Sequence, residues 1–354
     1  MKNYQNILIT GGAGFIGGNL IRRLLSTTNS KIHNIDKLGY ASDIKSIQNI
    51  NESKARHTLH NINLNNSSLV SSAVDIANPD LIIHLAAETH VDRSLDGPKE
   101  FMQSNIFGTF NILQATLKHY RKLPLNRKKV FKFHHVSTDE VFGSLGNKGR
   151  FNETTKYDPR SPYSASKASS DHLVRAWYHS YGLPIIITNC SNNYGPYQFP
   201  EKLIPLSIIK ALNKESIPVY GKGDNIRDWL YVDDHIDGII SAASNGVPGS
   251  TYCIGGNCEK TNLDLVKLIC NQLDNLFPSY KPHSTLIKFV EDRPGHDFRY
   301  SIDSSLIQKE LGWFPKTNIN DGIKETINWY IKNIDWCKKI LSYSGYEGQR
   351  LGLK

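Results

Sequence analysis

The sequence predicts an α/β protein with a parallel sheet covered by helices on both faces, followed by a smaller C-terminal lobe. From residue 6 to about residue 190, short and continuous apolar runs alternate with longer amphipathic runs. This is the pattern of parallel strands joined by crossover helices. Beyond Tyr194 the apolar runs become shorter and the loops longer, which indicates the smaller lobe. A chain of 354 residues is long enough for both parts.

The expected elements follow the chain in order. Strands are expected over residues 6–10, 31–36, 81–87, 131–137 and 184–190, and helices between them over 14–26, 67–77, 98–120 and 162–181. Further helices are expected over 201–213, 262–277 and 304–311. We therefore expect residues 1–194 to form the sheet domain, with a later return to it near 232–257, and residues 195–231 and 258–340 to form the lobe.

Composition limits the class of protein. The content of hydrophobic residues is 39% and that of charged residues 21%, both ordinary for a globular chain. No apolar run approaches the roughly 20 residues of a membrane span, and a first strand at about Asn6 leaves no room for a secretory signal. The five cysteines form no CxxC or metal-spaced cluster. We therefore expect a cytoplasmic protein with neither disulfides nor a metal site.

The net charge of +9 raises the question of nucleic-acid binding. The cations are scattered, however, and the one dense run, RKLPLNRKK at 121–129, is typical of a solvated loop between two elements. A diffuse basic excess suits solubility or the attraction of small anions such as nucleotides. No nucleic-acid or membrane partner is expected.

A glycine-rich stretch, TGGAGFIG at 10–17, follows the first expected strand directly and opens the first expected helix. Gly11, Gly14 and Gly17 give the spacing GxxGxxG, which permits a tight turn and close approach of a pyrophosphate to the helix N-terminus. Asp36 ends the second expected strand, where a carboxylate can bind a ribose 2′-hydroxyl and repels a 2′-phosphate. The pattern therefore predicts a site for NAD rather than NADP.

A tyrosine and a lysine lie four residues apart in YSASK, at Tyr163 and Lys167, and so on one face of the helix expected over 162–181. The lysine and the positive nicotinamide ring are expected to lower the pKa of the phenol, making it a base for a sugar or alcohol hydroxyl. Such a pair alone is common on protein surfaces. In combination with the glycine motif it indicates a redox site.

Thr138, Asp139 and Glu140 stand side by side directly after the apolar run 131–137. Adjacent carboxylates repel each other, and their burial is costly without partners. Taken alone, the three residues are most simply explained as a helix N-cap. Whether Thr138, Asp139 and Glu140 take part in a reaction has to be judged from the rest of the chain.

Several sequence blocks resemble the extended short-chain dehydrogenase family and, within it, the 4,6-dehydratases of nucleoside-diphosphate sugars. The resemblance extends from about Ile7 to Tyr330 and rests on TGGAGFIG, LAAETHVDRS (85–94), STDEVFG (137–143), SPYSASKASSDHLVRAW (161–177), NCSNNYGPYQFPEKLIP (189–205), PVYGKGDNIRDWLYVDDH (218–235) and DRPGHD (292–297). It implies a Rossmann-type doubly wound sheet, a C-terminal substrate-binding lobe, tightly held NAD and a homodimer.

The resemblance also implies a reaction, the dehydration of a nucleoside-diphosphate glucose (dTDP-glucose or UDP-glucose) to its 4-keto-6-deoxy form. This is a hydro-lyase reaction of deoxysugar, rhamnose-type biosynthesis. Tyr163, helped by Thr138 and Lys167, would take the 4-hydroxyl proton while C4 gives hydride to NAD. Glu140 would abstract the C5 proton, protonated Asp139 would protonate the departing 6-hydroxyl, and hydride would return to C6. Repulsion and burial raise one pKa of such a pair, so that one carboxyl can be acid and the other base.

Further contacts are carried over from the same resemblance. Cofactor contacts are expected from Gly11, Gly14, Phe15, Ile16, Gly17, Asp36, Lys37, Asn61, Ile62, Ala86, Ala87, Thr89, Ser104, Ser137, Tyr163, Lys167 and Asn193. Substrate contacts are expected from His90, Thr138, Asn192, Lys202, Leu203, Val219, Tyr220, Arg227, Asn262, Arg293 and His296. Asn61 stands where the family usually has aspartate. The cations among these residues suit a diphosphate.

The two helices expected over 98–120 and 162–181 are those that the family packs into the four-helix bundle of a homodimer. Their bulky side chains are Phe101, Phe107, Phe110, Leu113, His172, Leu173 and Trp177. A place in the chain's own core explains some of them equally well.

Alternative functions stay open at this point. A 4-epimerase or decarboxylase would use the same scaffold, although such epimerases typically carry small hydroxyl residues in place of Asp139 and Glu140. A non-catalytic NAD-binding protein is a different class, against which the intact Tyr163 and Lys167 argue. Thymine and uracil differ by one methyl group, a discrimination of at most about 1–3 kcal/mol, so the sequence leaves the base and the pathway undecided.

Overall fold

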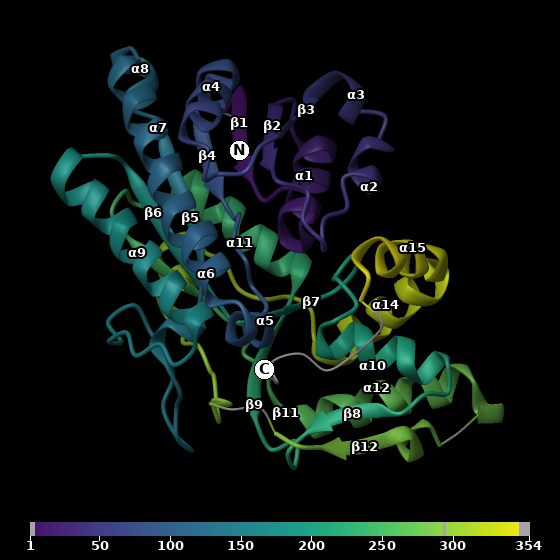
Figure 1. The fold of residues 1–354 in the computed structure, drawn as a ribbon. Coiled ribbons are helices and arrows are strands. Elements are labelled where there is room, and N and C mark those ends of the chain that lie inside the picture. The colour runs from purple at the N-terminus through teal and green to yellow at the C-terminus, as the bar shows by residue number, and fades with distance from the viewer. Residues whose placement is uncertain (1–3, 281, 293–294, 347–354) are drawn as a thin grey trace.

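The computed structural model describes residues 4–280, 282–292 and 295–346, and Figure 1 shows a larger upper part and a smaller lower part. The larger part contains a seven-stranded, parallel sheet with the order β10-β6-β5-β4-β1-β2-β3. This order confirms the expected doubly wound α/β fold. The strands are β1 (Asn6–Thr10), β2 (Lys31–Asp36), β3 (His57–Asn61), β4 (Leu81–His84), β5 (Lys132–Thr138), β6 (Ile185–Cys190) and β10 (Thr251–Ile254).

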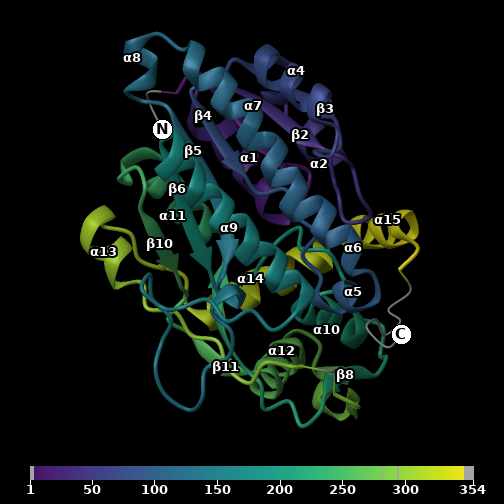
Figure 2. The same ribbon diagram turned by 60° about the vertical axis from the view of Figure 1, so that its left-hand side comes forward.

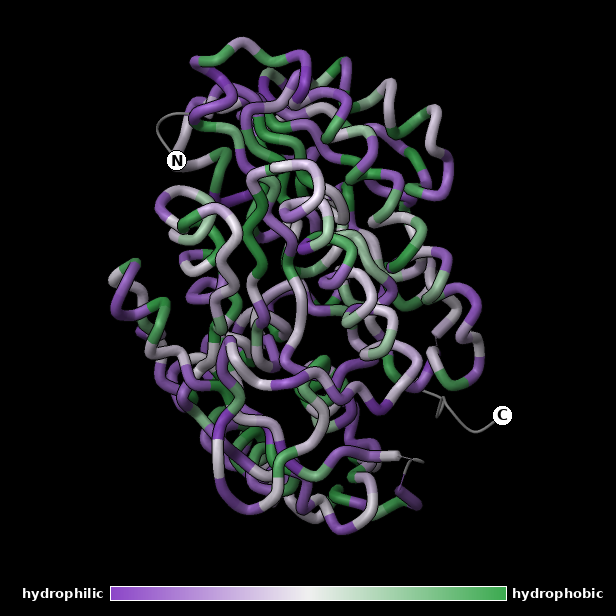
Figure 3. The backbone as a smooth tube through the Cα atoms, turned by 90° about the vertical axis from the view of Figure 1, so that its left-hand side faces the viewer, coloured by the Kyte–Doolittle hydropathy of each residue, from purple (hydrophilic) through white to green (hydrophobic). Residues whose placement is uncertain are grey.

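Helices cover both faces of this sheet. Ile7 and Ile9 of β1 pack in one core with α1 (Phe15–Thr27) and α11 (Val232–Asn245). Leu8 packs in another with α4 (Ser67–Ala77), α7 (Gly108–Lys122) and α9 (Pro162–Tyr181). Successive side chains of a strand point to opposite faces, so a strand covered on both faces is apolar at every position. Figure 2 shows α7 and α9 side by side on one face, and Figure 3 shows hydrophobic strands in the interior.

The observed elements depart from the expected ones in a few places. The strand expected over 81–87 ends at His84, and the helix expected over 98–120 is α6 (Pro98–Phe101), a π-helical turn η1 (Met102–Phe107) and then α7. β3 was not among the expected strands, because the polar sequence HTLHN forms the edge of the sheet and is not buried on both faces. Short elements complete this part: α2 (Lys45–Gln48), α3 (Ser53–Arg56), α5 (Val91–Asp96), α8 (Leu125–Lys128) and the 3-10 turn η2 (Asp139–Phe142).

The smaller part holds a three-stranded sheet, β11-β9-β7, and a separate pair, β12-β8. Its strands are β7 (Asn192–Tyr194), β8 (Ile217–Tyr220), β9 (Ile226–Tyr231), β11 (Glu259–Thr261) and β12 (Ile287–Val290). Its helical elements are α10 (Leu203–Leu212), α12 (Asn262–Leu276), η3 (Pro278–Tyr280), η4 (His283–Leu286), α14 (Ile319–Lys332) and α15 (Ile334–Ser344). A core that includes Tyr194, Trp229, Tyr231 and Tyr330 joins these elements with the exception of β11 and η3.

Between β9 and β11 the chain returns to the large sheet. There α11 packs on it and β10 pairs with β6; later in the chain, after β12, α13 (Ser305–Leu311) packs on β10. The division of the chain into a sheet domain and a lobe at the expected boundaries stays a prediction. Across the three described segments of the chain, we find no helix with the length and apolar character needed to cross a bilayer.

Candidate active site

A cleft runs along the carboxyl ends of the strands of the large sheet. It is lined by the turn between β1 and α1, by residues at the ends of β2, β4, β5 and β6, and by the segment from Ser191 to Lys202. Open α/β sheets bind ligands at this edge. The cleft therefore lies where the sequence predicts the NAD site.

The glycine turn leaves no room for side chains. Gly11 has a φ of +73°, and a Cβ there would lie 2.7 Å from the backbone of Ala86. A Cβ on Gly17 would lie 2.3 Å from the carbonyl oxygen of Gly11. The helix α1 begins at Phe15, and no side chain of the described residues caps it at Gly14. The first backbone N–H groups of this helix are therefore available to a phosphate.

Asp36 ties the glycine turn to the end of β2. Its Oδ2 accepts a hydrogen bond from the backbone N–H of Ala13 at 2.9 Å, and its Oδ1 accepts one from Leu38 at 2.8 Å. Burial raises the pKa of this carboxyl, while the backbone hydrogen bonds act in the opposite direction. Asp36 lines the cleft, at the position from which a ribose can be bound.

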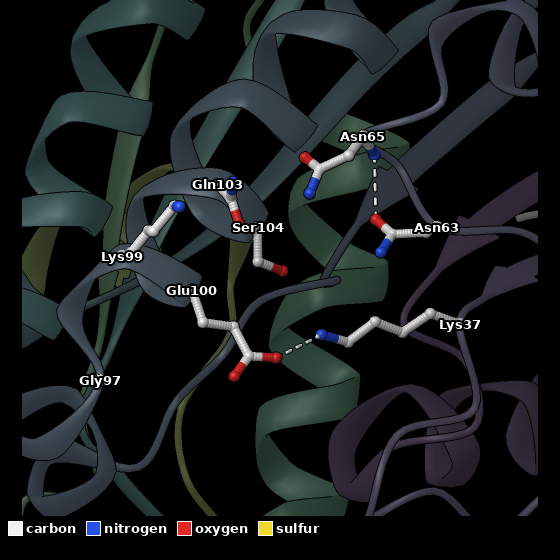
Figure 4. Close-up of a pocket in the computed structure, with 8 residues that line it drawn as sticks. All are labelled: Lys37, Asn63, Asn65, Gly97, Lys99, Glu100, Gln103 and Ser104. Carbon is white, nitrogen blue, oxygen red and sulfur yellow. Dashed lines mark hydrogen bonds and ion pairs between the residues drawn. The ribbon is translucent and has the colours of Figure 1, made fainter.

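A second cavity lies next to the cleft, beyond the end of β2 (Figure 4). It is lined by Lys37, Asn63, Asn65, Gly97, Lys99, Glu100, Gln103 and Ser104, and Lys37, Asn63 and Ser104 line the cleft as well. Lys37 Nζ lies 2.6 Å from Glu88 Oε1 and 3.1 Å from Glu100 Oε1. These ion pairs connect the loops after β2 and β4 at the mouth shared by the two cavities.

The five predicted catalytic residues, Thr138, Asp139, Glu140, Tyr163 and Lys167, all line the cleft. β5 ends at Thr138, whose Oγ1 accepts a hydrogen bond from the N–H of Glu140 at 3.3 Å. Thr138 is therefore the N-cap of η2, so the capping interpretation and the site interpretation hold together. Lys167 Nζ donates a hydrogen bond to the carbonyl oxygen of Val136 at 3.0 Å, which anchors α9 to β5.

Asp139 lies in an environment that favours its neutral form. It is buried, and burial raises the pKa of its carboxyl well above the ordinary value, with further contributions from the charges of Glu140 and Asp228. A carboxyl group that stays protonated at neutral pH can act as a general acid. This direction matches the role expected for Asp139.

The lowered pKa expected for Tyr163 depends on Lys167 and the nicotinamide charge together and stays a prediction, whereas in the protein chain by itself the pKa is raised. Burial raises the pKa of its phenol well above the usual value, and the charge of Glu140 and the Cys190 thiol add to this shift. Lys167 is buried too, and burial lowers its pKa. A phenol in so apolar a site needs an additional positive charge before it can act as a base.

The predicted cofactor residues gather in the cleft with one exception. Asn61 is exposed at the end of β3 and lines neither cavity. The others that line the cleft are Gly11, Gly14, Phe15, Ile16, Gly17, Asp36, Lys37, Ile62, Ala86, Ala87, Thr89, Ser104, Ser137, Tyr163, Lys167 and Asn193.

The predicted substrate residues divide into two groups. Thr138, Asn192 and Lys202 line the cleft. Leu203 begins α10 beside it, whereas the others stand outside its lining: His90, Val219, Tyr220, Arg227, Asn262 and His296. Arg293 lies outside the described residues.

Contacts within the lobe, and one contact from the lobe to α5, hold several residues of the outer group. The Arg227 guanidinium donates to the carbonyl oxygen of Asp297 at 3.0 Å and lies 4.2 Å from the centre of the Tyr300 ring. The Tyr220 hydroxyl donates to Asp92 Oδ2 at 3.3 Å, and its ring lies edge-on to that of His296. Val219 is buried in the core of the lobe.

Sequence reasoning missed two residues that organise this cleft. Glu201 is buried and accepts hydrogen bonds from the Tyr40 hydroxyl at 2.7 Å and from Arg93 Nε at 3.1 Å. Glu201 lies in the block NCSNNYGPYQFPEKLIP at 189–205, and this membership was the sequence feature that could have identified it. Asn105 lies in the π-helical turn, accepts from the N–H of Glu88 at 2.8 Å and donates to Ser166 Oγ at 2.8 Å. No periodic pattern marks a π-helical turn, so the sequence carried no signal for Asn105.

Comparison with known proteins shows what this chain is similar to. The family model described as GDP-mannose 4,6 dehydratase matches residues 8–326. A dTDP-glucose 4,6-dehydratase of Escherichia coli is 48% identical over 99% of both chains, and one of Neisseria meningitidis serogroup B is 47% identical over 98% of this chain and 99% of its own.

Solved structures also show similarity to dTDP-glucose 4,6-dehydratases. A dTDP-glucose 4,6-dehydratase of Streptomyces venezuelae, crystallised with NAD, superimposes with a TM-score of 0.86 at 37% identity over 94% of this chain and 99% of its own. One of Bacillus anthracis, in complex with NAD, has a TM-score of 0.82 at 40% identity over 95% and 99%. A UDP-glucose 4-epimerase of Thermotoga maritima has a TM-score of 0.81 at only 25% identity, over 93% and 99%.

Proposed function

Since this chain belongs to the dTDP-glucose 4,6-dehydratase family, we propose that it acts on dTDP-glucose and that the residues of the cleft have the roles given below. The protein is an NAD-dependent hydro-lyase that forms a 4-keto-6-deoxy sugar nucleotide. The dehydratase function is favoured over the 4-epimerase function because the identity to dehydratases is much higher. The observation in the cleft that supports it is the buried acid Asp139, next to Glu140 and Tyr163.

The residues of the cleft suit NAD. The glycine turn excludes side chains where a pyrophosphate would approach, and Asp36 stands where a ribose would bind. The residues that would hold the cofactor are those of the turn, Asp36, and the ends of β4 and β5. When bound, NAD supplies a hydride acceptor and donor and a positive ring charge, which lowers the pKa of a neighbouring phenol.

Each proton transfer of the reaction is carried out by one of three side chains. Tyr163, with Thr138 beside it, takes the proton of the 4-hydroxyl as C4 is oxidised. The resulting ketone acidifies the C5 hydrogen, which Glu140 removes. Asp139, kept neutral by burial, gives its proton to the 6-hydroxyl, which leaves as water. When C6 is reduced, Glu140 returns its proton to C5. The proton that Tyr163 takes from the 4-hydroxyl replaces, through solvent, the proton that Asp139 gave up, so one water leaves and the protons balance over one turnover.

The test of this function is product analysis with dTDP-glucose and UDP-glucose in parallel. The expected product shows the base-dependent absorbance of a 4-keto sugar, and kcat/KM is expected to be higher for dTDP-glucose, by about tenfold from one fitted methyl group. A galactosyl product without a 4-keto sugar would establish the epimerase instead. Equal kcat/KM values for the two substrates would contradict the proposed preference for thymine over uracil, but not the dehydratase function.

A homodimer and a cytoplasmic location are further parts of this proposal. Phe107 at the end of η1, Phe110 on α7 and Tyr181 on α9 are exposed to 60%, 38% and 48%, which supports a partner surface along these helices. Phe101 and Leu113, in contrast, are buried in the chain's own structure. The location is supported by the five cysteines, all of which are free.

A further inference from the structure

An aspartate that the proposed mechanism does not use lies directly behind the catalytic residues. Asp171 is fully buried on α9, one helical turn beyond Lys167. Four side chains from other elements surround its carboxylate. Its Oδ1 lies 3.1 Å from His135 Nε2, and its Oδ2 accepts hydrogen bonds from Tyr157 Oη at 2.8 Å, Ser137 Oγ at 2.9 Å and Asn189 Nδ2 at 3.3 Å.

Lys167 is the buried cation of this region. Its Nζ donates a hydrogen bond to a neutral group, the carbonyl oxygen of Val136. A buried ammonium group without an opposite charge is costly, and it is more stable as the neutral amine. A counter-ion is therefore needed if Lys167 is to stay charged.

The other titratable groups around Lys167 are not suited to this task. Burial lowers the pKa of His135 to about 4 and raises that of Cys190 to about 12, so both are neutral at pH 7. Asp139 is kept in its neutral form by burial. Arg175, the remaining cation, donates to the Tyr157 hydroxyl at 2.9 Å.

Asp171, in contrast, is held in its ionised form. Burial raises the pKa of its carboxyl, but the hydrogen bond with His135, the charge of Lys167 and the hydrogen bond of Ser137 outweigh burial, and the pKa falls below its usual value. The charge of Asp171 in turn opposes the effect of burial on the pKa of Lys167.

We propose that Asp171 is the buried counter-ion that keeps Lys167 positively charged, and that it is thereby a positioning residue for the Tyr163–Lys167 pair. The inference rests on the proposed function for the roles of that pair. The geometry supports it independently: a fully buried carboxylate stands one turn from a buried ammonium group, and β5, β6 and the loop before α9 all direct polar groups to it.

The first experiment measures charge coupling by thermal unfolding of Asp171→Asn, Lys167→Met and the double variant. Asp171→Asn leaves a buried cation and is expected to lower Tm the most. The double variant is expected to be more stable than Asp171→Asn, because no unpaired charge remains. Tyr157→Phe combined with Lys167→Met is the matched control, and its two effects are expected to add. An additive result for Asp171→Asn with Lys167→Met would overturn the inference.

The second experiment follows the pH dependence of C4 oxidation, read as single-turnover formation of NADH, a step in which Asp139 takes no part. As the pH rises, Lys167 loses its charge and the rate falls. In Asp171→Asn this fall is expected about 1 pH unit or more below that of the wild type, because one nearby opposite charge is lost. In Tyr157→Phe, which removes two hydrogen bonds and no charge, the profile is expected to stay within about half a unit. A uniform loss of rate at every pH would indicate a purely structural Asp171.

These two experiments separate the inference from the function on which it rests. If the wild type forms no 4-keto product, the proposed function fails, and the unfolding cycle still decides whether Asp171 and Lys167 are coupled. If the wild type forms the product but the cycle is additive, only the inference fails.

Discussion

Asp139 Oδ1 accepts a hydrogen bond from Thr138 Oγ1 at 3.2 Å, and within the described residues Asp139 Oδ2 has no partner at all. A buried carboxylate with one unsatisfied oxygen is unfavourable, whereas the protonated form leaves Oδ2 as a donor directed to a ligand. The Thr138–Asp139 pair thus combines a fixed orientation with a proton held in place. These contacts support the proposed role of Asp139 as the general acid.

Replacing this acid separates the two halves of the reaction. In Asp139→Asn we expect NADH to form on mixing with dTDP-glucose, while loss of water slows by about 10²–10⁴-fold because no proton reaches the 6-hydroxyl. Because burial raises the pKa of Asp139, the wild-type dehydration step is expected to persist well above the ordinary aspartate range. It is then lost as the pH rises through the raised pKa. The measurement is quenched-flow detection of NADH and product, with the remote, exposed Asp75→Asn as control; unchanged dehydration in Asp139→Asn would exclude the role.

The glycine turn predicts a loss of cofactor on a minimal change. Gly11→Ala places a Cβ 2.7 Å from the Ala86 backbone at a φ of +73°, so the turn must shift where the pyrophosphate would lie. We expect the purified variant to contain little bound NAD, measured by its release on denaturation. Gly146→Ala, whose Cβ has nothing within 4 Å, is the matched control. Equal NAD content in both variants would place the cofactor elsewhere.

The C-terminal helix is expected to influence cofactor retention. Trp336 Nε1 donates to Asp43 Oδ2 at 2.7 Å, and the N–H of Asp43 donates to the Ala13 carbonyl in the glycine turn at 2.7 Å. Trp336→Phe removes the first hydrogen bond, worth about 1.5 kcal/mol to a charged acceptor, so NAD should dissociate roughly tenfold faster. Stopped-flow displacement of NADH measures this rate. Tyr343→Phe, exposed on the same helix, should leave the rate unchanged.

The proposed dimer can be tested at Phe107. Its side chain is exposed to 60% on the last position of η1, and a glutamate there would bring a charge into an apolar interface at the cost of its hydration. Phe107→Glu is therefore expected to shift the molecular mass in solution from dimer to monomer, measured by light scattering. Val247→Glu replaces a similarly exposed residue away from α7 and α9. A monomeric wild type, or dimers in both variants, would contradict the bundle.

Local sequence was informative wherever one short segment forms the structure. The helices over 67–77 and 162–181 have the expected bounds because their apolar periodicity and caps lie within the segment, as with Asn66 before α4 and Ser161 before α9. β3 was not predicted because an edge strand does not need apolar residues at every position. Burial, a property of the whole fold, raises the pKa of Tyr163 in the protein chain, and no local sequence pattern indicates this effect.

The sequence by itself determined the doubly wound sheet, the glycine turn and the identity of the chemical groups, since each depends on residues that lie close together in the chain. Only the tertiary structure decided the environment of those groups: the raised pKa of Asp139, the buried phenol of Tyr163, the buried Asp171 one turn from Lys167, and the hydrogen bond from Trp336 to Asp43. Burial and electrostatic coupling arise from atoms that packing brings together from distant parts of the chain, and no local pattern of residues predicts this proximity.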